Sequence, residues 1–258
     1  MKQRLKDKVA VITGASKGIG AAIMQRFLEE GAKVVAASRE PATGEESVKK
    51  AIAAAGGGQA VFQKCDVINS ADIKACVDRA VSEFGTLDIM VNNAAWQPNK
   101  TILETDDELF DKCMRTNARS VFIGTREAAR CMIALKKGGV IINLSSTFAL
   151  VGSPGYTAYH TSKGAIASLT RAAAIALMPH GIRVDGLIPG SVETPGLYDG
   201  ARDTGDIEKG LAGFMAVQPL KRFGRPEEIA AAAAFLASDD ASLVYGANMV
   251  VDGGYTVI

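Results

Sequence analysis

Short apolar runs alternate along the chain with longer stretches in which apolar residues recur at helical spacing. Near-continuous apolar runs are typical of strands that are buried on both faces of a sheet. Seven such strands are expected, at residues 9–13, 33–38, 60–64, 88–92, 140–144, 183–188 and 248–251. Strands that alternate with helices predict a doubly wound, Rossmann-like α/β fold, with a parallel sheet covered by helices on both faces. No linker rich in Pro, Gly or Ser interrupts this pattern, so one domain is expected over residues 1–258.

The helical stretches carry start signals. Ser70 is expected to cap a helix that runs to Phe84. A capping box from Thr105 to Glu108 opens a long helix toward Ile133. Residues 190–215 break the pattern, because they form a long glycine-containing stretch with no clean strand. Such segments in compact domains are usually functional, and this one is expected to form a lid over a substrate site.

Composition limits the classes of protein to which the chain can belong. Hydrophobic residues make up 48% and charged residues 22%, and 29 basic residues balance 28 acidic ones to a net charge of +1. This balance argues against a nucleic-acid-binding surface. Met1 to Lys8 lacks the apolar stretch of a signal peptide, and no apolar run is long enough to span a bilayer, so a cytoplasmic protein without membrane contact is expected. None of the four cysteines forms a C-x-x-C pair, which predicts reduced thiols and no metal site.

The first expected strand leads directly into Thr13-Gly14-Ala15-Ser16-Lys17-Gly18-Ile19-Gly20, and a helix follows. Glycines at a strand-to-helix turn let the backbone approach a pyrophosphate, which the helix N-terminus also attracts. The spacing G-x-x-x-G-x-G differs from the common dinucleotide pattern G-x-G-x-x-G. A tight turn without a ligand would use the same glycines.

The end of the second strand bears on the choice of cofactor. A carboxylate there would bind the adenosine ribose and select NAD, but this chain has Ser38 followed by Arg39. A guanidinium can bind a 2′-phosphate, and Lys17 can add a second positive charge. NADP(H) is therefore the preferred cofactor and NAD(H) a possible one. Glu40 nearby works against this preference, and both cations could simply be solvated.

Tyr159 and Lys163 are four residues apart and share one face of an expected helix. A neighbouring ammonium stabilises a phenolate, so the pair is a candidate acid/base unit. Ser145 and Ser146 end the strand at 140–144, where ligands bind in a doubly wound sheet. Asn92 and Asn93 end the fourth strand in the same crevice. Asn117 lies inside the long expected helix, where an amide is a poor helix former.

Taken in order, these motifs resemble the short-chain dehydrogenase/reductase family over the whole chain. The glycine motif of the family matches Thr13 to Gly20, and its adenine-contacting acidic residue matches Asp66, followed by Val67. Its N-N-A-G motif appears as Asn92-Asn93-Ala94-Ala95, with Ala95 in place of the glycine. The remaining family positions match Asn117, Ser146, Tyr159, Lys163, Pro189, Gly190 and Thr194; the spacing to the tyrosine selects Ser146 over Ser145.

The resemblance implies a mechanism. Tyr159 would exchange a proton with the substrate oxygen, Ser146 would polarise that oxygen, Lys163 would lower the tyrosine pKa and bind the nicotinamide ribose, and Asn117 would hold a water in a proton relay. Ile188 and Thr194 would contact the nicotinamide amide. The implied cofactor contacts are Gly14, Ser16, Lys17, Gly18, Ile19, Gly20, Ser38, Arg39, Asp66, Val67, Asn93, Ala94, Tyr159, Lys163, Pro189, Gly190 and Thr194.

The resemblance further implies an NADP(H)-dependent enzyme that interconverts a small ketone or aldehyde with an alcohol. The Tyr–Lys spacing is that of carbonyl reductases and not of enoyl reductases. Two alternatives stay open: an NAD-preferring sugar, polyol or steroid dehydrogenase, and a non-catalytic dinucleotide sensor. A homotetramer is also implied, and alanine-rich helices and an apolar tail at 246–258 fit it. Candidate substrate contacts are Trp96, Gln97, Thr147, Phe148, Leu150, Tyr156 and residues 192–215, including Leu197, Tyr198 and Phe214. Trp96 could equally pack in the core. Arg202 and Lys209 are expected to be solvated surface charges, unless the lid folds inward and one of them becomes a charge clamp.

Overall fold

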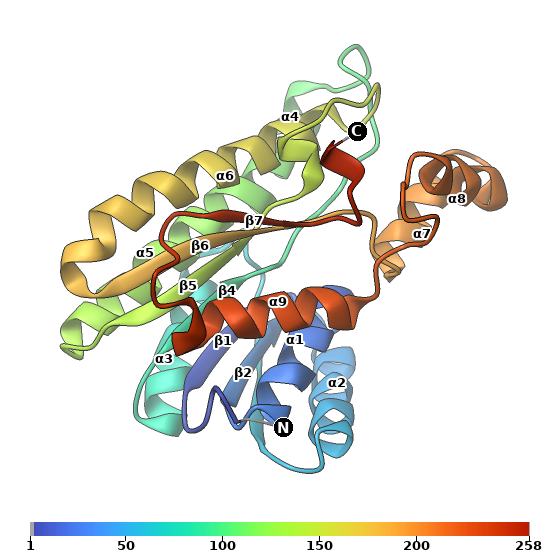
Figure 1. Cartoon of the computed structure of the whole chain (residues 1–258). Coiled ribbons are helices and arrows are strands. Elements are labelled where there is room, and N and C mark those ends of the chain that lie inside the picture. The colour runs from blue at the N-terminus through green and yellow to red at the C-terminus, as the bar shows by residue number, and fades with distance from the viewer. Residues whose placement is uncertain (1–2, 258) are drawn as a thin grey trace.

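The computed structural model describes residues 3–257; residues 1, 2 and 258 of the expected domain lie outside this part. Seven strands form one parallel sheet in the order β3-β2-β1-β4-β5-β6-β7 (Figure 1). The strands are β1 (Val9–Thr13), β2 (Lys33–Ser38), β3 (Gln59–Lys64), β4 (Ile89–Asn92), β5 (Gly139–Leu144), β6 (Ile182–Pro189) and β7 (Asn248–Val251). All seven expected strands and the doubly wound α/β class are confirmed, with bounds that shift by one residue at a few ends.

Helices cover both faces of the sheet (Figure 1). The helices are α1 (Gly18–Glu29), α2 (Pro41–Ala54), α3 (Ser70–Phe84), α4 (Asp107–Met114), α5 (Ser120–Ala134), α6 (Thr157–Leu177), α7 (Pro195–Arg202), α8 (Ile207–Ala216) and α9 (Pro226–Ala237). Helices α1, α2 and α9 pack on one face, and α3, α5 and α6 pack on the other.

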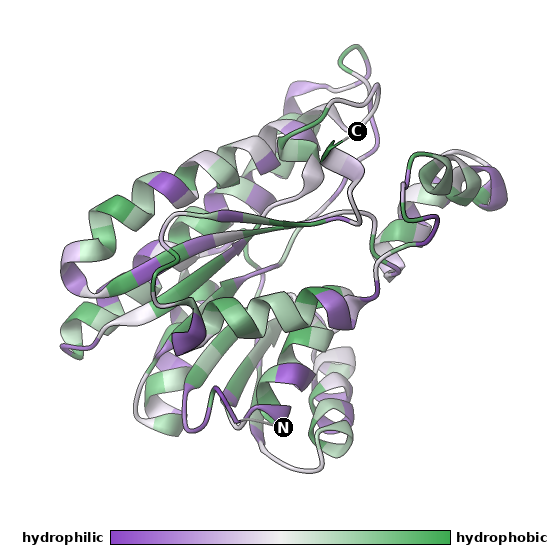
Figure 2. Cartoon of the chain, viewed as in Figure 1, coloured by the Kyte–Doolittle hydropathy of each residue, from purple (hydrophilic) through white to green (hydrophobic). Residues whose placement is uncertain are grey.

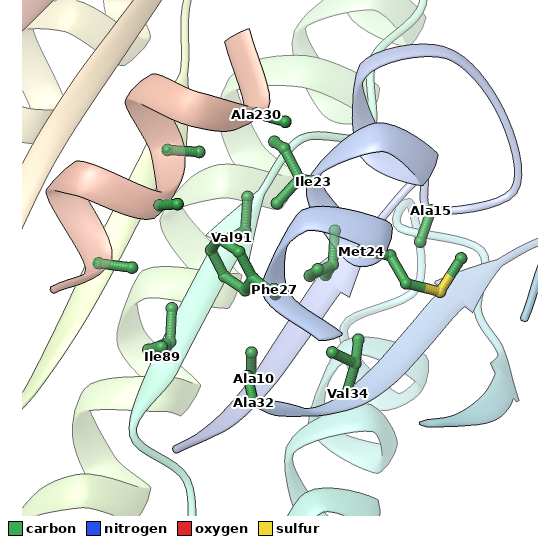
Figure 3. Packing of buried hydrophobic residues seen from close by; sticks show 14 of the residues in the cluster. Ala10, Ala15, Ile23, Met24, Phe27, Ala32, Val34, Ile89, Val91 and Ala230 are labelled. Carbon is green, nitrogen blue, oxygen red and sulfur yellow. The ribbon is translucent and has the colours of Figure 1, made fainter. Parts of the chain in front are cut away.

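The alternation of side chains along each strand builds two cores. On β1, Ala10 and Ile12 face the α1 and α9 side, whereas Val9 and Val11 face α3 and α5. Phe27 of α1 is fully buried in the first core (Figure 3). The strands are therefore apolar on both faces, and Figure 2 shows this as nearly continuous green along the central strands. Burial on both faces holds the strands of the sheet in place. Because β1, β4 and β5 are parallel neighbours, their carboxyl ends lie together at one edge of the sheet.

The long helix expected toward Ile133 is divided in two. A π-helical turn at Arg115–Arg119 separates α4 from α5. The cap of α4 also differs from the expected box: Asp106 accepts the hydrogen bond from the Leu109 N–H, while the Thr105 hydroxyl donates to the Thr101 carbonyl. At α3, Asn69 occupies the cap position and Ser70 is already helical, so the expected Ser70 cap is wrong.

Residues 190–215, here called the lid segment, contain α7 and most of α8, which stand out from the sheet and its helices in Figure 1. Neither helix was expected from the sequence. The base of the segment is fixed, because Gly224 pairs with the backbone of Ser191 and Glu193 at 2.9 and 2.8 Å. Within residues 3–257, no helix combines the length and apolar character needed to cross a membrane.

Candidate active site

The turn after β1 has the backbone shape of a phosphate-binding loop. Gly14 and Gly18 have φ values of +68° and +56°, in the left-handed region that side chains disfavour. A Cβ at Gly14 would lie 2.9 Å from Ala94 Cα, and one at Gly20 would collide with the Gly14 carbonyl oxygen. Each glycine of the motif is therefore required locally, either by its dihedral angles or by close backbone packing.

Asn93 holds this turn against the end of β4. Its side-chain amide donates to the carbonyl oxygens of Thr13 at 2.9 Å and Gly14 at 3.2 Å. The Thr13 hydroxyl in turn accepts from the N–H groups of Asn93 and Ala94. These polar contacts join the ends of β1 and β4, the two central strands between which the strand order changes direction. They do not cover the amino end of α1. Asn92 lies elsewhere: it is buried within the sheet and donates to Asn143 at 2.9 Å.

A groove of about 650 Å³ runs over the glycine turn. Its lining includes Gly14, Ser16, Lys17, Gly18, Ile19, Gly20, Ser38, Arg39, Asp66, Val67, Asn93, Ala94 and Thr194, all of them implied cofactor positions. Glu40, Thr43, Ile68, Ala95, Trp96 and Thr116 also line the groove, and of these Thr43, Ile68 and Thr116 were not anticipated. These three residues lie in separate loops and helices that meet only at this edge of the sheet, so no sequence motif connects them.

The residues of this groove fit a dinucleotide. The Ser38 hydroxyl is buried and has no hydrogen-bond partner among the residues that the structure describes. Arg39 and Lys17 are exposed, and no ion pair of either appears in the described chain. Two unneutralised cations beside an unpaired hydroxyl form a donor set suited to a phosphate.

A second hollow, here called the catalytic cavity, adjoins the groove and shares Ile19, Asn93, Ala95, Thr194 and Gly196 with it. Its volume is about 200 Å³. The other lining residues are Gln97, Leu144, Ser145, Ser146, Thr147, Phe148, Tyr156, Tyr159, Lys163, Pro189, Gly190, Ser191, Val192, Leu197, Gly200 and Phe214. The structure thus brings Ser146, Tyr159 and Lys163 together with Pro189 and Gly190, although up to 44 positions separate them (190 − 146).

Tyr159 and Lys163 lie on one face of α6, with the ammonium 5.4 Å from the centre of the tyrosine ring. Burial raises the pKa of Tyr159, and hydrogen bonding from Ser146 offsets only part of that increase. This direction is opposite to the one expected from the lysine alone. Burial also lowers the pKa of Lys163 to about 8, and its Nζ donates to the Leu144 carbonyl at 2.8 Å. Tyr159 is therefore a protonated phenol at neutral pH, a state suited to giving up a proton.

The two neighbouring serines differ in their contacts. The Ser145 hydroxyl is buried and donates to the Lys163 carbonyl at 2.8 Å, which attaches α6 to the end of β5. The Ser146 hydroxyl accepts from the Phe148 N–H at 3.2 Å and also hydrogen-bonds the Tyr159 side chain. Because its hydroxyl is not bound to the backbone of α6, Ser146 is the better candidate of the two for a hydrogen bond to a substrate oxygen.

Asn117 lies in the π-helical turn and is fully buried. Its Oδ1 accepts from the Trp96 N–H, and its Nδ2 donates to the Trp96 carbonyl and to Ser162 Oγ. These contacts fix the orientation of the side-chain amide against the loop after β4. π-Helical turns often mark functional sites, and this one carries the amide to the loop after β4.

Several expected substrate contacts lie elsewhere. Leu150 and Tyr198 line neither hollow, and Trp96 lines the cofactor groove instead of the catalytic cavity. Ile188 is fully buried in β6. Arg202 pairs with Asp199 and Lys209 with Asp206 on the exposed surface of the lid segment, in agreement with solvated surface charges and not with a charge clamp. Gln97, Thr147, Phe148, Tyr156, Val192, Leu197 and Phe214 do line the cavity as anticipated.

Comparison with known proteins identifies the class. The sequence model of a family described as enoyl-(acyl carrier protein) reductase matches residues 14–256. The chain belongs to the short-chain dehydrogenase/reductase family, and it is an oxidoreductase of the kind that acts on alcohols and ketones.

Its similar relatives are named dehydrogenases. The chain is 41% identical to 3beta-hydroxysteroid dehydrogenase 2 of Eggerthella lenta, with 98% of this chain and 96% of that protein aligned. It is 39% identical to cis-4-hydroxycyclohexanecarboxylate dehydrogenase of Sinomonas cyclohexanicum over the full length of both chains. It is 37% identical to cyclopentanol dehydrogenase of Comamonas testosteroni over 98% of each chain.

Solved structures agree on the fold. A short-chain type dehydrogenase/reductase from Mycobacterium marinum superposes with a TM-score of 0.92 at 33% identity, over 99% of this chain and 98% of that one. Levodione reductase superposes with a TM-score of 0.93 at 29% identity, over 98% of each chain.

Proposed function

We propose that this protein is an NADP(H)-dependent dehydrogenase that interconverts alicyclic secondary alcohols and the corresponding ketones. The observation that carries the proposal is the placement of Ser146, Tyr159 and Lys163 in one cavity that opens directly into the dinucleotide-sized groove. A reacting carbon in this cavity would lie beside Pro189, Gly190 and Thr194, the lining residues expected to border a nicotinamide.

The substrate class is supported by the cavity and by the relatives. Lys163 is the one charged side chain in the described lining of the catalytic cavity, and it is occupied by the Leu144 carbonyl. Phe148, Leu197 and Phe214 supply apolar surface. The relatives are named for a steroid, a hydroxycyclohexanecarboxylate and cyclopentanol, all of which are alicyclic alcohols. An alicyclic ring fits this largely apolar lining better than a sugar phosphate does.

The proposed chemistry follows from the protonation states. In the reducing direction, Tyr159 donates its phenolic proton to the carbonyl oxygen, and its raised pKa keeps that proton in place at neutral pH. Ser146 hydrogen-bonds the same oxygen and stabilises the charge that develops on it. Lys163 would hydrogen-bond the nicotinamide ribose. Asn117 acts by positioning, because its amide fixes the Trp96 backbone at the border of the groove.

The bound nicotinamide cofactor would exchange a hydride with the substrate carbon. The glycine turn would hold the pyrophosphate, Asp66 and Val67 would border the adenine, and Pro189, Gly190 and Thr194 would border the nicotinamide. Ser38, Arg39 and Lys17 would bind the 2′-phosphate of NADP(H). A preference for NAD(H) is the second candidate, because the Glu40 carboxylate lines the same end of the groove and would repel that phosphate.

We further propose a cytoplasmic homotetramer. Three of the four free cysteines are buried, which suits a reducing compartment. Large apolar side chains are exposed on α5 and α6 and near the C-terminus, including Phe122, Ile175, Leu243 and Val257. Exposed apolar side chains of this size on adjacent elements are typical of surfaces that pack against another subunit.

The test is the absorbance of NADPH and NADH during reduction of cyclohexanone and cyclopentanone. We expect turnover with NADPH, and a loss of kcat of at least about a hundredfold in Tyr159→Phe, the size expected for a general acid. Tyr245→Phe is the matched control, since Tyr245 is exposed and lines neither hollow. Turnover that survives Tyr159→Phe would overturn the assignment of the acid, and no turnover of either ketone with either cofactor would overturn the proposed function.

A further inference from the structure

Tyr156 lines the catalytic cavity but is not used by the proposed reaction. Its side chain is 5% exposed, and its hydroxyl is buried with no hydrogen-bond partner among the residues that the structure describes. Buried polar atoms are normally paired, so an unpaired hydroxyl at a cavity wall calls for a partner. A ligand in the cavity can be that partner.

The backbone holds Tyr156 in a costly position. Its φ is +65° and its ψ is +26°, a left-handed conformation that bulky residues rarely adopt, just before α6 begins. Strain of this kind persists where the surrounding structure enforces it, and it is common at binding sites. Here the Phe148 ring packs against Tyr156 with ring centres 5.4 Å apart.

Gly200 of the lid segment lies over the same hydroxyl. A Cβ at Gly200 would lie 3.2 Å from Tyr156 Oη and 3.9 Å from the Phe214 ring. Glycine inside a helix is unfavourable, and Gly200 is in the interior of α7. Its missing side chain leaves room at the end of the Tyr156 side chain, between the body of the protein and the lid segment.

The charges around the Tyr156 hydroxyl determine which kind of ligand group it can bind. Burial, with a smaller effect of the Asp203 charge, raises the pKa of Tyr156, so the hydroxyl is protonated and can donate. Apolar Phe148 and Phe214 surround it, and no ammonium or guanidinium lines this end of the cavity in the described chain. The matching group is therefore an uncharged oxygen that accepts a hydrogen bond.

Phe148 packs against both Tyr156, which is the second hydrogen-bond donor, and Tyr159, where the reaction would take place. Its ring centre is 6.0 Å from the Tyr159 ring in an edge-on arrangement, as well as 5.4 Å from the Tyr156 ring. A ligand ring that lies against Phe148 can present one oxygen to Tyr159 and another to Tyr156.

We propose that Tyr156 is a specificity-determining residue, whose hydroxyl donates a hydrogen bond to a second, uncharged oxygen on the substrate ring, away from the carbon that reacts at Tyr159. The enzyme therefore favours alicyclic ketones that carry a further carbonyl or hydroxyl group over the plain cyclic ketone. This inference rests on the proposed function.

The experiment compares kcat/KM for cyclohexanone and cyclohexane-1,4-dione in the full-length protein, with the dione value halved for its two equivalent carbonyls. Wild type should favour the dione by roughly fivefold to tenfold, as one hydrogen bond predicts. Tyr156→Phe should remove this preference by raising the KM for the dione more than the KM for cyclohexanone. Tyr245→Phe should keep the preference.

Gly200→Ala is a second variant that leaves the Tyr156 hydroxyl in place and crowds it. It should lower kcat/KM for the dione more than for cyclohexanone, and it keeps the test decisive if Tyr156→Phe does not fold. Equal use of both ketones by wild type, or an equal effect of each variant on both, would overturn the role of Tyr156 while the proposed function stands. Failure of wild type to reduce either ketone would overturn the proposed function instead.

Discussion

The side-chain amide of Asn117 brackets the backbone of Trp96, accepting from its N–H and donating to its carbonyl, both at 2.8 Å. Asn117 lies in the π-helical turn between α4 and α5, whereas Trp96 follows β4 on the loop that borders the cofactor groove. This buried amide thus gives the Trp96 backbone the two hydrogen bonds that a neighbouring strand would supply inside a sheet. The loop is held rigid at the point where the groove and the catalytic cavity meet.

Replacing this amide should loosen the loop. Asn117→Ala leaves the Trp96 N–H without its buried acceptor and removes a donor from the Trp96 carbonyl, so we expect the free energy of unfolding to fall by about 2–3 kcal/mol. Chemical denaturation measures this change. The control is Asn69→Ala, because Asn69 is exposed and its side chain caps nothing. Equal stability of the two variants would contradict a bracing role for Asn117.

Two glycines with similar dihedral angles separate the effect of strain from that of the site. Gly14 and Gly56 have φ values of +68° and +73°, but a Cβ meets Ala94 at Gly14 and open space at Gly56. Gly56→Ala should lose about 1–2 kcal/mol of stability from its dihedral angle alone, and Gly14→Ala should lose more, because its Cβ also crowds Ala94. Only Gly14→Ala should also weaken NADPH binding, by at least about tenfold, because the added methyl disturbs the turn over which the pyrophosphate would lie.

Trp96 provides the readout for that binding experiment. It is the one tryptophan in the sequence, and it lines the groove, so bound NADPH should quench its fluorescence. An NADPH affinity in Gly14→Ala equal to that in Gly56→Ala would contradict the placement of the pyrophosphate at this turn.

Arg39 should decide the cofactor preference. Arg39→Ala is expected to raise the KM for NADPH about tenfold to a hundredfold, the loss expected for hydrogen bonds to a charged group, and to leave the KM for NADH nearly unchanged. Arg171→Ala is the matched control, since Arg171 is exposed and lines neither hollow. Should wild type already use NADH as well as NADPH, the Glu40 carboxylate outweighs the guanidinium and the NAD(H) alternative is correct.

Burial of Lys163 should make stability depend on pH in a defined window. Its pKa is lowered from 10.5 to about 8, so the folded protein releases this proton at a lower pH than the unfolded chain does. The penalty for burying the charge is full below pH 8 and is relieved as the pH rises toward 10.5. Lys163→Met lacks the charge, and its melting temperature should therefore exceed that of wild type at pH 7 by a margin that shrinks between pH 8 and 10.5. A margin that stays constant across this range would show that the lysine is not buried as a cation.

The apolar surface of α6 should form subunit contacts. Ile175 is 71% exposed on that helix. Light scattering should give a mass close to four chains of 26.9 kDa for wild type and a smaller assembly for Ile175→Arg, because a buried guanidinium without a partner is unfavourable. A monomeric wild type would contradict the proposed tetramer.

The sequence alone determined the order of strands and helices, because strands buried on both faces require the nearly continuous apolar runs that the chain shows at each of them. It also identified the local chemistry: glycines that take positive φ values, and Tyr159 and Lys163 one helical turn apart. These features depend on neighbours within a few residues, so a linear pattern contains them.

Only the tertiary structure decided what depends on packing between distant segments. It replaced the expected helix through Asn117 with a π-helical turn, since the Asn117 amide is drawn to the backbone of Trp96, 21 positions away (117 − 96). It placed Tyr159 where burial raises the pKa of the phenol, and hydrogen bonding to Ser146 offsets only part of that increase. It also brought Gly200 against the Tyr156 hydroxyl, 44 positions away (200 − 156). Burial and contact across the fold set the pKa values and the shape of the cavity, and neither quantity is a property of a residue and its sequence neighbours.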